Sequence, residues 1–221
     1  MARRKRFLII GLGKFGFHVA KTLFEEGHEV IALDRDQERV QRMDEFCTEA
    51  IVLDATDKEK LAVLAPEEMD AAVVSTGSDT GKSILITLYL SELGVKNILT
   101  KAVNEDHGKI LSRVGARELI EPEKSMAIRI AQGLSTPNMI DFLPLERGYS
   151  LLQIAPPRPF IGKTLAQLNL RARYNIYVIA VKEIVPDNFV MLPPADFLIK
   201  DSDVLIMVGR QEDIKKVGEL E

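Results

Sequence analysis

Hydrophobic residues follow two alternating patterns along the first 120 residues. Short apolar runs predict β-strands at 7–10, in a run that ends at Asp34, and at 50–53, 70–74, 97–101 and 117–120. Between these runs, polar segments with apolar residues at helical spacing predict helices after the first strand and at 37–46, 56–64, 82–93 and 105–114. Thr56 and Glu59 are spaced as the capping box of the third of these helices. Strands that alternate with helices predict an α/β fold, with a parallel sheet covered by helices on both faces.

The pattern changes after residue 120. Residues 123–134 read as an amphipathic helix, whose apolar stripe is Met126, Ala127, Ile130, Ala131 and Leu134. Such a stripe ordinarily packs on the sheet of its own domain, and burial against a second copy of the chain is the alternative. Residues 135–148 are expected to form a connector anchored by a few apolar side chains.

A smaller module follows from residue 149. Short runs rich in β-branched residues predict strands near 150–155, 176–182, 189–192 and 204–208, and Thr164 with Gln167 predicts a capped short helix. A last helix is expected over 211–217. With about 70 residues, this α+β module is near the lower limit for an isolated core, so we expect it to pack against a neighbour. The predicted domains are therefore 1–134 and 149–221, joined by 135–148.

A glycine-rich loop separates the first predicted strand from its helix. Its residues are Gly11-Leu12-Gly13-Lys14-Phe15-Gly16, and Asp34 lies 18 residues after the last of them. This is close to the roughly 20 residues found in dinucleotide-binding βαβ units. Gly11 permits the tight turn, Gly13 lets a phosphate approach the backbone, and Gly16 allows close helix–strand packing. With helix N–H groups for the phosphate and Asp34 for a ribose diol, the stretch predicts a Rossmann-like nucleotide site.

The other residues of this site are expected at the carboxyl ends of the strands, where parallel sheets bind their ligands. The predicted nucleotide-binding residues are Gly11, Leu12, Gly13, Lys14, Phe15, Gly16, Asp34, Arg35, Asp54, Ala55, Thr56, Ser75, Thr76, Gly77 and Lys101. The charge of Asp34 disfavours a 2′-phosphate, so NADP is not expected. Lys14 can meet a terminal phosphate, which dinucleotides lack, and therefore favours ATP or ADP over NAD(H).

Composition adds a few exclusions. The chain has 221 residues, 46% of them hydrophobic, and a formal net charge of −4, so nothing indicates a nucleic-acid partner. The basic cluster Arg3-Arg4-Lys5-Arg6 is interpreted as a solvated leader. Cys47 is the single cysteine, which fits a reducing cytosol. No apolar stretch reaches the roughly 18–20 residues of a membrane span, and we expect a soluble, cytoplasmic protein.

Residues that carry catalytic chemistry are few. The three histidines, His18, His28 and His107, are not spaced for a metal site or for a nucleophile–base pair, and structural roles are expected for them. The C-terminal module contains no histidine to act as the acid–base residue of a dehydrogenase. We therefore expect a nucleotide site without catalysis. A small NAD-dependent oxidoreductase, and a redox sensor or transcriptional regulator that reads NADH, stay open as alternatives.

Motifs along nearly the whole chain resemble a known family. They are IIGLGKFG near the start, ALDRD at the second strand, LDATD at the third, TKA at 100–102, GARELIEPEKSMA at 115–127 and RARYNIYVIAVK in the C-terminal module. In their order and spacing they resemble the cytosolic RCK (regulator of potassium conductance) subunits of bacterial Ktr and Trk potassium uptake systems. Residues 1–134 look like the RCK N-domain and residues 149–221 like the RCK C-domain.

The resemblance implies a regulatory role beside a membrane. Members form homodimers by exchanging crossover helices, and four dimers form an octameric gating ring. ATP and ADP bind in the N-domain and set the shape of the ring, which docks on the cytoplasmic side of a membrane K⁺-translocating subunit and gates it. Some members bind a cyclic dinucleotide in the C-domain, for which this chain has no decisive signature.

The resemblance also implies roles for single residues. Asp34 matches the ribose-binding acid, the three glycines match the phosphate loop, and Lys101 matches a lysine near the nucleotide. Lys14 stands where relatives often carry an arginine for the terminal phosphate of ATP, so the charge is kept but the bidentate fork is lost. Glu123 matches an acid that in some members binds a divalent cation, Mg²⁺ or Ca²⁺, between the two dimer halves.

Overall fold

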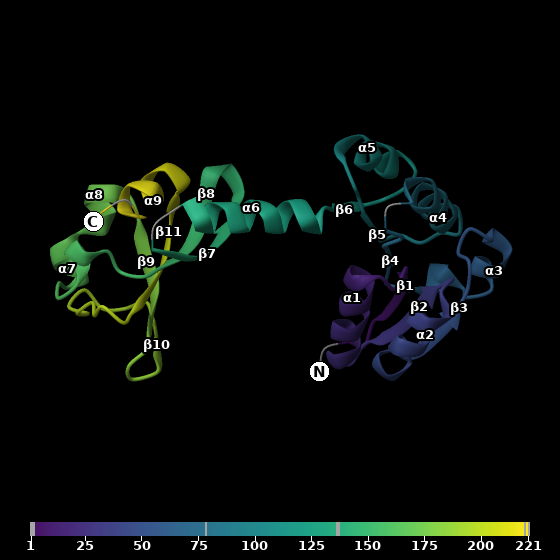
Figure 1. The fold of residues 1–221 in the computed structure, drawn as a ribbon, viewed down its shortest axis with the longest axis horizontal. Helices are drawn as coiled ribbons and strands as arrows, with labels where there is room; N and C mark the ends of the chain where they lie inside the picture. Colours follow the sequence, from purple (N-terminus) through teal and green to yellow (C-terminus); the bar gives the residue numbers. More distant parts are fainter. Residues whose placement is uncertain (1–2, 78, 136–137, 219, 221) are drawn as a thin grey trace. The chain divides into compact units, whose positions relative to one another are not determined.

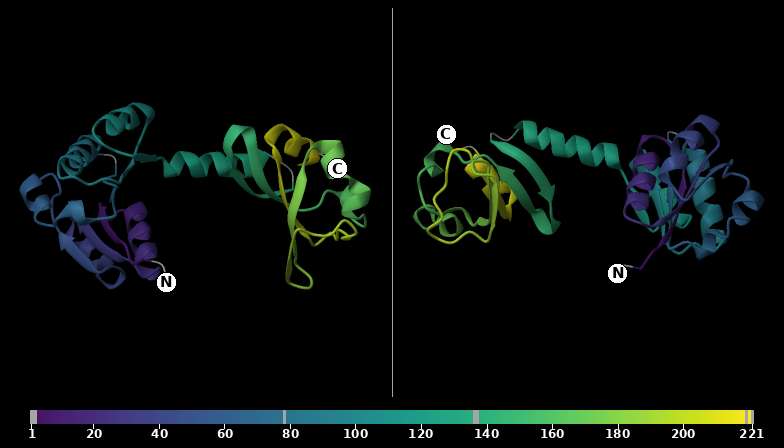
Figure 2. Two further views of the ribbon diagram at one scale, coloured as in Figure 1. Left: turned by 180° about the vertical axis from the view of Figure 1, so that it is seen from behind. Right: turned by 90° about the horizontal axis from the view of Figure 1, so that it is seen from below.

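The chain folds as two compact units, residues 1–122 and 123–221. The structure is a computed structural model that describes residues 3–77, 79–135, 138–218 and 220. Figure 1 labels the elements of each unit, and Figure 2 shows them from two further sides.

The first unit is built on a six-stranded parallel sheet (Figure 1). Its strands are β1 (Arg6–Ile10), β2 (Glu29–Asp34), β3 (Glu49–Val52), β4 (Ala71–Val74), β5 (Ile98–Lys101) and β6 (Glu118–Ile120). They lie in the order β3-β2-β1-β4-β5-β6. The first three strands are added towards one edge of the sheet and the last three towards the other, with the change between β1 and β4. This is the Rossmann-type order, and the predicted fold class is confirmed.

Helices cover both faces of this sheet. They are α1 (Lys14–Glu25), α2 (Gln37–Met43), α3 (Lys58–Ala62), α4 (Thr80–Glu92) and α5 (Glu105–Arg113), with 3-10 turns at Asp44–Phe46 and Pro66–Glu68. Successive side chains of a strand point to opposite faces, so β1 contributes to two cores. Leu8 and Ile10 pack with α3 and α4, whereas Ile9 packs with α1 and α2. Burial on both faces explains why this strand is a continuous apolar run.

The second unit contains a five-stranded antiparallel sheet in the order β10-β9-β11-β8-β7. Its strands are β7 (Met139–Pro144), β8 (Tyr149–Ile154), β9 (Tyr177–Glu183), β10 (Asn188–Met191) and β11 (Val204–Arg210). Its helices are α6 (Pro122–Ser135), α7 (Leu165–Leu168), α8 (Leu170–Tyr174) and α9 (Gln211–Gly218), with 3-10 turns at Glu146–Gly148 and Arg158–Phe160. Leu152, Leu205 and Met207 are fully buried between these elements. The β9–β10 hairpin extends from the rest of the unit (Figure 2), and a small α+β module is confirmed.

One predicted helix cap is confirmed and another is wrong. The Thr164 hydroxyl accepts the N–H of Gln167 at 3.2 Å, and the Gln167 side chain accepts the N–H of Thr164 at 2.9 Å, which makes the expected capping box of α7. Thr56, however, does not cap α3. Its hydroxyl donates to Asp54 Oδ1 at 2.7 Å, and Asp57 caps the helix by accepting the N–H of Lys60 at 3.2 Å.

The segment 135–148, expected to be an irregular connector, contains strand β7. The side chain of Phe142 is only 4% exposed and packs in the core of the second unit, while its backbone pairs with β8. Phe142 and the partly buried Met139 anchor an edge strand whose other residues are exposed or half-buried. Residues 136–137 of the segment lie outside the described residues.

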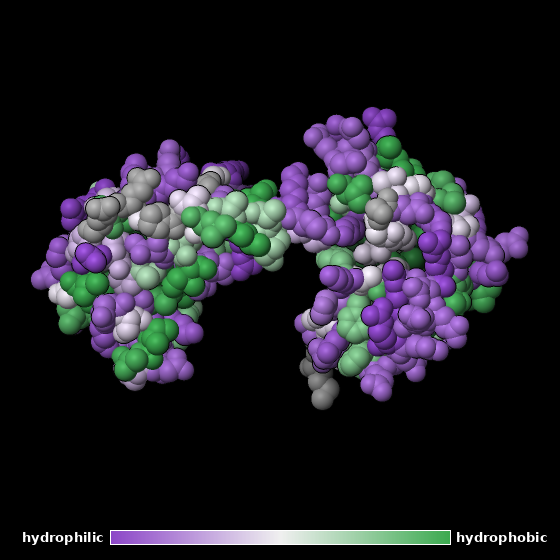
Figure 3. Space-filling view, in the orientation of Figure 1, coloured by the Kyte–Doolittle hydropathy of each residue, from purple (hydrophilic) through white to green (hydrophobic). Residues whose placement is uncertain are grey.

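Helix α6 forms where the sequence predicts it and keeps its apolar side chains in solvent. Met126, Ile130 and Leu134 are 50%, 55% and 85% exposed, and within α6, which is described throughout, no residue is buried. Hydrophobic residues are visible along this helix in Figure 3. The ordinary expectation, a stripe packed on its own sheet, is therefore wrong for this chain. None of the described helices is long and apolar enough to cross a membrane.

Candidate nucleotide-binding site

The glycine loop connects β1 to α1 at the carboxyl edge of the first sheet. Gly11 has a φ of 93°, and a Cβ there would lie 2.2 Å from the carbonyl oxygen of Ser75. A Cβ on Gly16 would lie 1.9 Å from the carbonyl oxygen of Gly11. Both positions therefore require glycine. A Cβ on Gly13 would meet no atom within 4 Å, so the middle glycine borders open space from which a ligand can approach.

The start of α1 is suited to an anion. The N-cap is Gly13, no side chain of the described residues caps the first N–H groups, and the first turn contains no acidic residue. Unpaired N–H groups and the helix dipole together attract negative charge at such an end. Lys14 is exposed at the first helical position and adds a positive charge, while Phe15 packs partly into the core beneath the loop.

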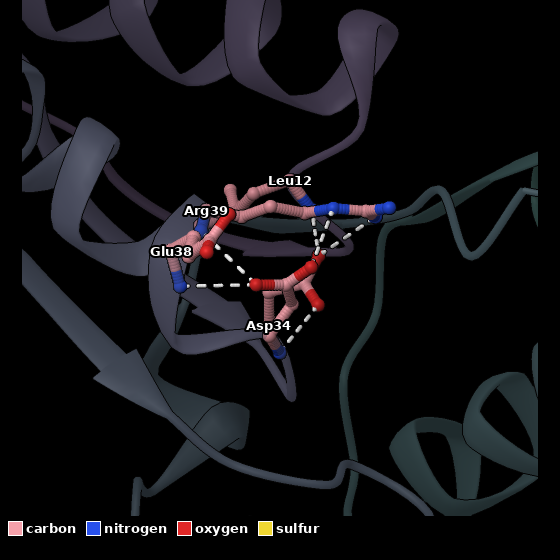
Figure 4. A network of polar contacts seen from close by, with 5 residues as sticks. Leu12, Asp34, Glu38 and Arg39 are labelled. Carbon is pink, nitrogen blue, oxygen red and sulfur yellow. Dashed lines mark hydrogen bonds and ion pairs between the residues drawn. The ribbon is translucent and has the colours of Figure 1, made fainter.

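Asp34 ties the glycine loop to the end of β2. Asp34 is 8% exposed, and its carboxylate accepts the N–H of Leu12 at 2.7 Å and the N–H of Asp36 at 3.0 Å (Figure 4). Oδ1 receives the bond from Asp36 and keeps a lone pair for a further donor, while the second partner of Oδ2 is a long contact of 3.5 Å from Arg39 that a ligand can replace. Asp34 can therefore shape the loop and accept ribose hydroxyls at the same time.

Sequence reasoning missed Arg39 at this point. Its guanidinium, from the first turn of α2, lies 3.5 Å from Asp34 Oδ2 and 3.3 Å from Asp36 Oδ2 (Figure 4). The side chain is partly exposed, so these pairs are weak and exchangeable. One feature of the sequence could have indicated this contact: Arg39 is a cation five residues after Asp34, in a helix that starts at the same edge of the sheet. Arg35, which the sequence does predict for the site, is exposed.

The loop after β4 lies against the glycine loop. Ser75 is 6% exposed, and its N–H donates to the carbonyl of Ile10 at 2.7 Å. Thr76 Oγ1 is buried without a hydrogen-bond partner among the described residues. A buried hydroxyl left in this way costs about 1–3 kcal/mol, and a ligand oxygen beside it would remove that cost. Gly77 follows with a φ of 71° and is exposed.

The remaining predicted residues share this edge but lie further from the glycine loop. Asp54, Ala55 and Thr56 follow β3, two strands from β1, and Lys101 ends β5, two strands away on the other side. Hydrogen bonds from the hydroxyl and N–H of Thr56 hold the pKa of Asp54 below its ordinary value. Ala55 is buried in the core of the first unit. Lys101 is half-buried.

The predicted metal residue and the histidines lie elsewhere. Glu123 is exposed in the first turn of α6, in the second unit. Among the described residues, no group of three or more His, Cys, Asp or Glu side chains is arranged to hold a metal ion. His18 is exposed, and His28 is half-buried in the turn before β2. His107 is buried between α4 and α5.

Comparison with known proteins identifies relatives along the whole chain. The model of the TrkA-N domain family matches residues 7–122, and that of the TrkA-C domain family matches residues 150–220. The chain is 38% identical to Ktr system potassium uptake protein C of Bacillus subtilis, over 96% of each chain. It is 35% identical to Ktr system potassium uptake protein A of the same organism, over 97% of this chain and 96% of the relative.

Solved structures share the fold at low sequence identity. The crystal structure of the GsuK RCK domain superimposes with a TM-score of 0.69 and 16% identity, over 99% of this chain and 48% of that one. A GsuK channel described as bound to NAD gives a TM-score of 0.68, also at 16% identity, and this chain covers 40% of it. Identity this low extends the likeness to the fold alone.

Proposed function

The chain belongs to the family of Ktr potassium uptake proteins built from a TrkA-N and a TrkA-C domain, and we propose that it is a nucleotide-sensing regulatory subunit of a membrane potassium transporter. The observation that carries this proposal is the glycine loop with Asp34 bonded across it. This arrangement presents N–H groups for a phosphate and, beside them, a carboxylate for a ribose.

Adenine nucleotides with a free terminal phosphate are the proposed ligands. Lys14 is exposed beside the uncapped start of α1, where a γ- or β-phosphate would meet both the helix dipole and a cation. The internal diphosphate of NAD(H) has no terminal group for this lysine. ATP and ADP are therefore expected to bind more tightly than NADH. Because they differ by one charged phosphate, they are also suited to stabilise different arrangements of an assembly.

Assembly of several copies is the second part of the proposal. The exposed apolar side chains of α6 support burial against another copy, because an exposed stripe of this kind marks an interaction surface. In this proposal α6 forms the contact between the two chains of a homodimer, and four homodimers form an octameric ring. Glu123 would hold Mg²⁺ or Ca²⁺ between the dimer halves, since hard cations prefer carboxylate oxygens. The ring would act on the cytoplasmic side of its membrane K⁺-translocating subunit.

Competition calorimetry with ATP, ADP and NADH tests the ligand class. Both adenine nucleotides should bind, and NADH should bind more weakly. Tighter binding of NADH than of either nucleotide would contradict the ligand choice, and NADH turnover with a small substrate would favour an oxidoreductase. Tight NADH binding together with specific DNA binding would favour a redox-sensing transcriptional regulator.

Two substitutions at Gly13 give matched controls for this titration. A Cβ at this position meets no atom within 4 Å, so both Gly13→Ala and Gly13→Asp should fold. The aspartate adds a negative charge where the phosphate approaches, and it should abolish binding of every nucleotide. The alanine adds only a methyl group and should weaken binding less. Equal affinity in the two variants would argue that the phosphate lies elsewhere.

A further inference from the structure

His107 connects the loop after β5 to the start of α4. The ring lies in the first turn of α5 and is 4% exposed. Its Nδ1 accepts the N–H of Val103 at 3.3 Å, in the loop that follows Lys101. Its Nε2 lies 2.9 Å from the hydroxyl of Ser83 in α4, the helix that follows Gly77. One side chain therefore joins the loop after β5 to the helix after β4.

These contacts fix the protonation state of the ring. A backbone N–H is always a donor, so Nδ1 must carry a lone pair and the proton of the neutral ring lies on Nε2. Nε2–H donates to Ser83 Oγ, whose own hydroxyl donates to the carbonyl of Thr80 at 3.0 Å. A second proton on Nδ1 would point at the N–H of Val103. The contact with the loop after β5 would then change from attraction to repulsion.

Two further hydroxyls link the backbone of Ser83 to the sheet. Thr87 Oγ1 donates to the carbonyl of Ser83 at 2.7 Å and lies 3.3 Å from Thr100 Oγ1, in β5 next to Lys101. Ser83, Thr87 and Thr100 are buried. Ser83, Thr87 and Thr100 thus join the start of α4 to β5, and movement of the His107 ring would disturb this buried polar contact.

We propose that His107 is a positioning residue of the nucleotide site, which keeps the start of α4 and the loop after β5 in their binding geometry only while its ring is neutral. The proposal rests on the proposed function, since it assumes that Lys101 and the residues after β4, which border these two segments, contact a nucleotide. It predicts that acid weakens nucleotide binding through a group that never touches the ligand. By the same linkage, a bound nucleotide should make the ring harder to protonate.

The surroundings of the ring agree with a group that is neutral at physiological pH. Burial lowers the pKa of His107 from its ordinary 6.5, and the carbonyl of Thr80 opposes that shift. The charged side chains on α4, β5 and α5 are Asp79, the N-cap of α4, with Lys82 and Glu92 of that helix, Lys101 of β5, and Glu105, Asp106, Lys109 and Arg113 of α5. Asp79, Glu105 and Asp106 are exposed, so solvent screens them from the ring. Protonation of the ring is therefore expected at a lower pH than for an ordinary histidine.

The test is the pH dependence of ADP affinity in the full-length chain, from pH 8 to pH 5.5. His107→Asn is the informative variant, because its Oδ1 can accept the N–H of Val103 and cannot be protonated. His28→Asn is the matched control, since His28 lies in the turn before β2, at the opposite edge of the sheet. Protonation of the phosphates of ADP affects all three proteins equally.

On acidification, ADP affinity should fall more steeply in the wild type and in His28→Asn than in His107→Asn. The additional loss of affinity should be up to about tenfold per pH unit. Parallel profiles in all three proteins would overturn the inference while leaving nucleotide binding intact. No ADP binding by the wild type at pH 8 would overturn the proposed function as well.

A measurement on the wild type covers the case in which His107→Asn fails to fold. Histidine-selective NMR labelling gives the pKa of His107 with and without ADP. ADP should lower it by up to about one unit, which corresponds to about tenfold in affinity. The same pKa in both states would overturn the inference, because a purely structural histidine is not linked to the ligand.

Discussion

Asp34→Asn separates the two roles that the structure gives to this residue. The substitution keeps the shape of the side chain and removes its charge. Oδ2 accepts the N–H of Leu12 at 2.7 Å, and Oδ1 accepts the N–H of Asp36 at 3.0 Å. An asparagine has one oxygen, so in either orientation its NH₂ group faces one of these backbone donors.

The expected loss can be worked from these two bonds. A hydrogen bond to a charged group contributes about 1.5–3 kcal/mol, and at 8% exposure water replaces little of it. We therefore expect Asp34→Asn to lower the free energy of unfolding of the free protein by about 2 kcal/mol, or the melting temperature by roughly 5–10 °C. The ribose hydroxyls would also lose a charged acceptor, which should lower the affinity for ADP by about 10- to 100-fold.

Thermal melting without ligand and calorimetry with ADP measure the two effects separately. Glu38→Gln is the matched control, because it makes the same carboxylate-to-amide change at an exposed position on α2 and should alter neither quantity. 2′-deoxy-ADP should lose less affinity than ADP on going from wild type to Asp34→Asn. Unchanged stability would refute the role of Asp34 in holding the loop, and unchanged ADP affinity would refute its role towards the ribose.

Three further substitutions test other parts of the account. Lys14→Ala should lower the affinity for ATP by about tenfold and the affinity for ADP by about two- to threefold in calorimetry, because ATP places more charge beside this lysine. An equal loss of affinity for both nucleotides would argue against a terminal phosphate at Lys14. Glu123→Gln should remove the extra thermal stabilisation that Mg²⁺ or Ca²⁺ gives to the ATP-bound protein, and undiminished stabilisation would exclude this carboxylate as a ligand. Ile130→Lys, at a position 55% exposed, should lower the mass measured by light scattering and leave ADP affinity unchanged; an unaltered mass would mean that α6 is not the assembly surface.

The first sheet could be predicted because its signals are local. A strand covered on both faces must be apolar, as β1 is from Phe7 to Ile10, and Gly11 and Gly16 have no room for a side chain. The capping box of α7 is equally local, with both partners inside four residues. In each case the signal itself can be recognised within a short segment of the sequence, even where the atoms that pack against it, such as the Ser75 carbonyl at Gly11, are distant along the chain.

The parts that could not be predicted depend on competition or on distant partners. Thr56 and Asp57 are adjacent candidates for one cap, and Asp54 decides between them by taking the Thr56 hydroxyl. His107 and Ser83 are 24 residues apart, and no periodicity indicates their contact. The apolar stripe of α6 could be read from the sequence, but periodicity alone does not say which surface covers it.

Potassium flux into vesicles that carry a Ktr-type membrane subunit is the most direct test of the proposed function. The flux would be measured with and without this chain, in ATP and in ADP. The account predicts that the chain changes the flux, that the two nucleotides give different rates, and that Asp34→Asn reduces this difference. The same flux in ATP and in ADP, at concentrations at which both are bound, would contradict it.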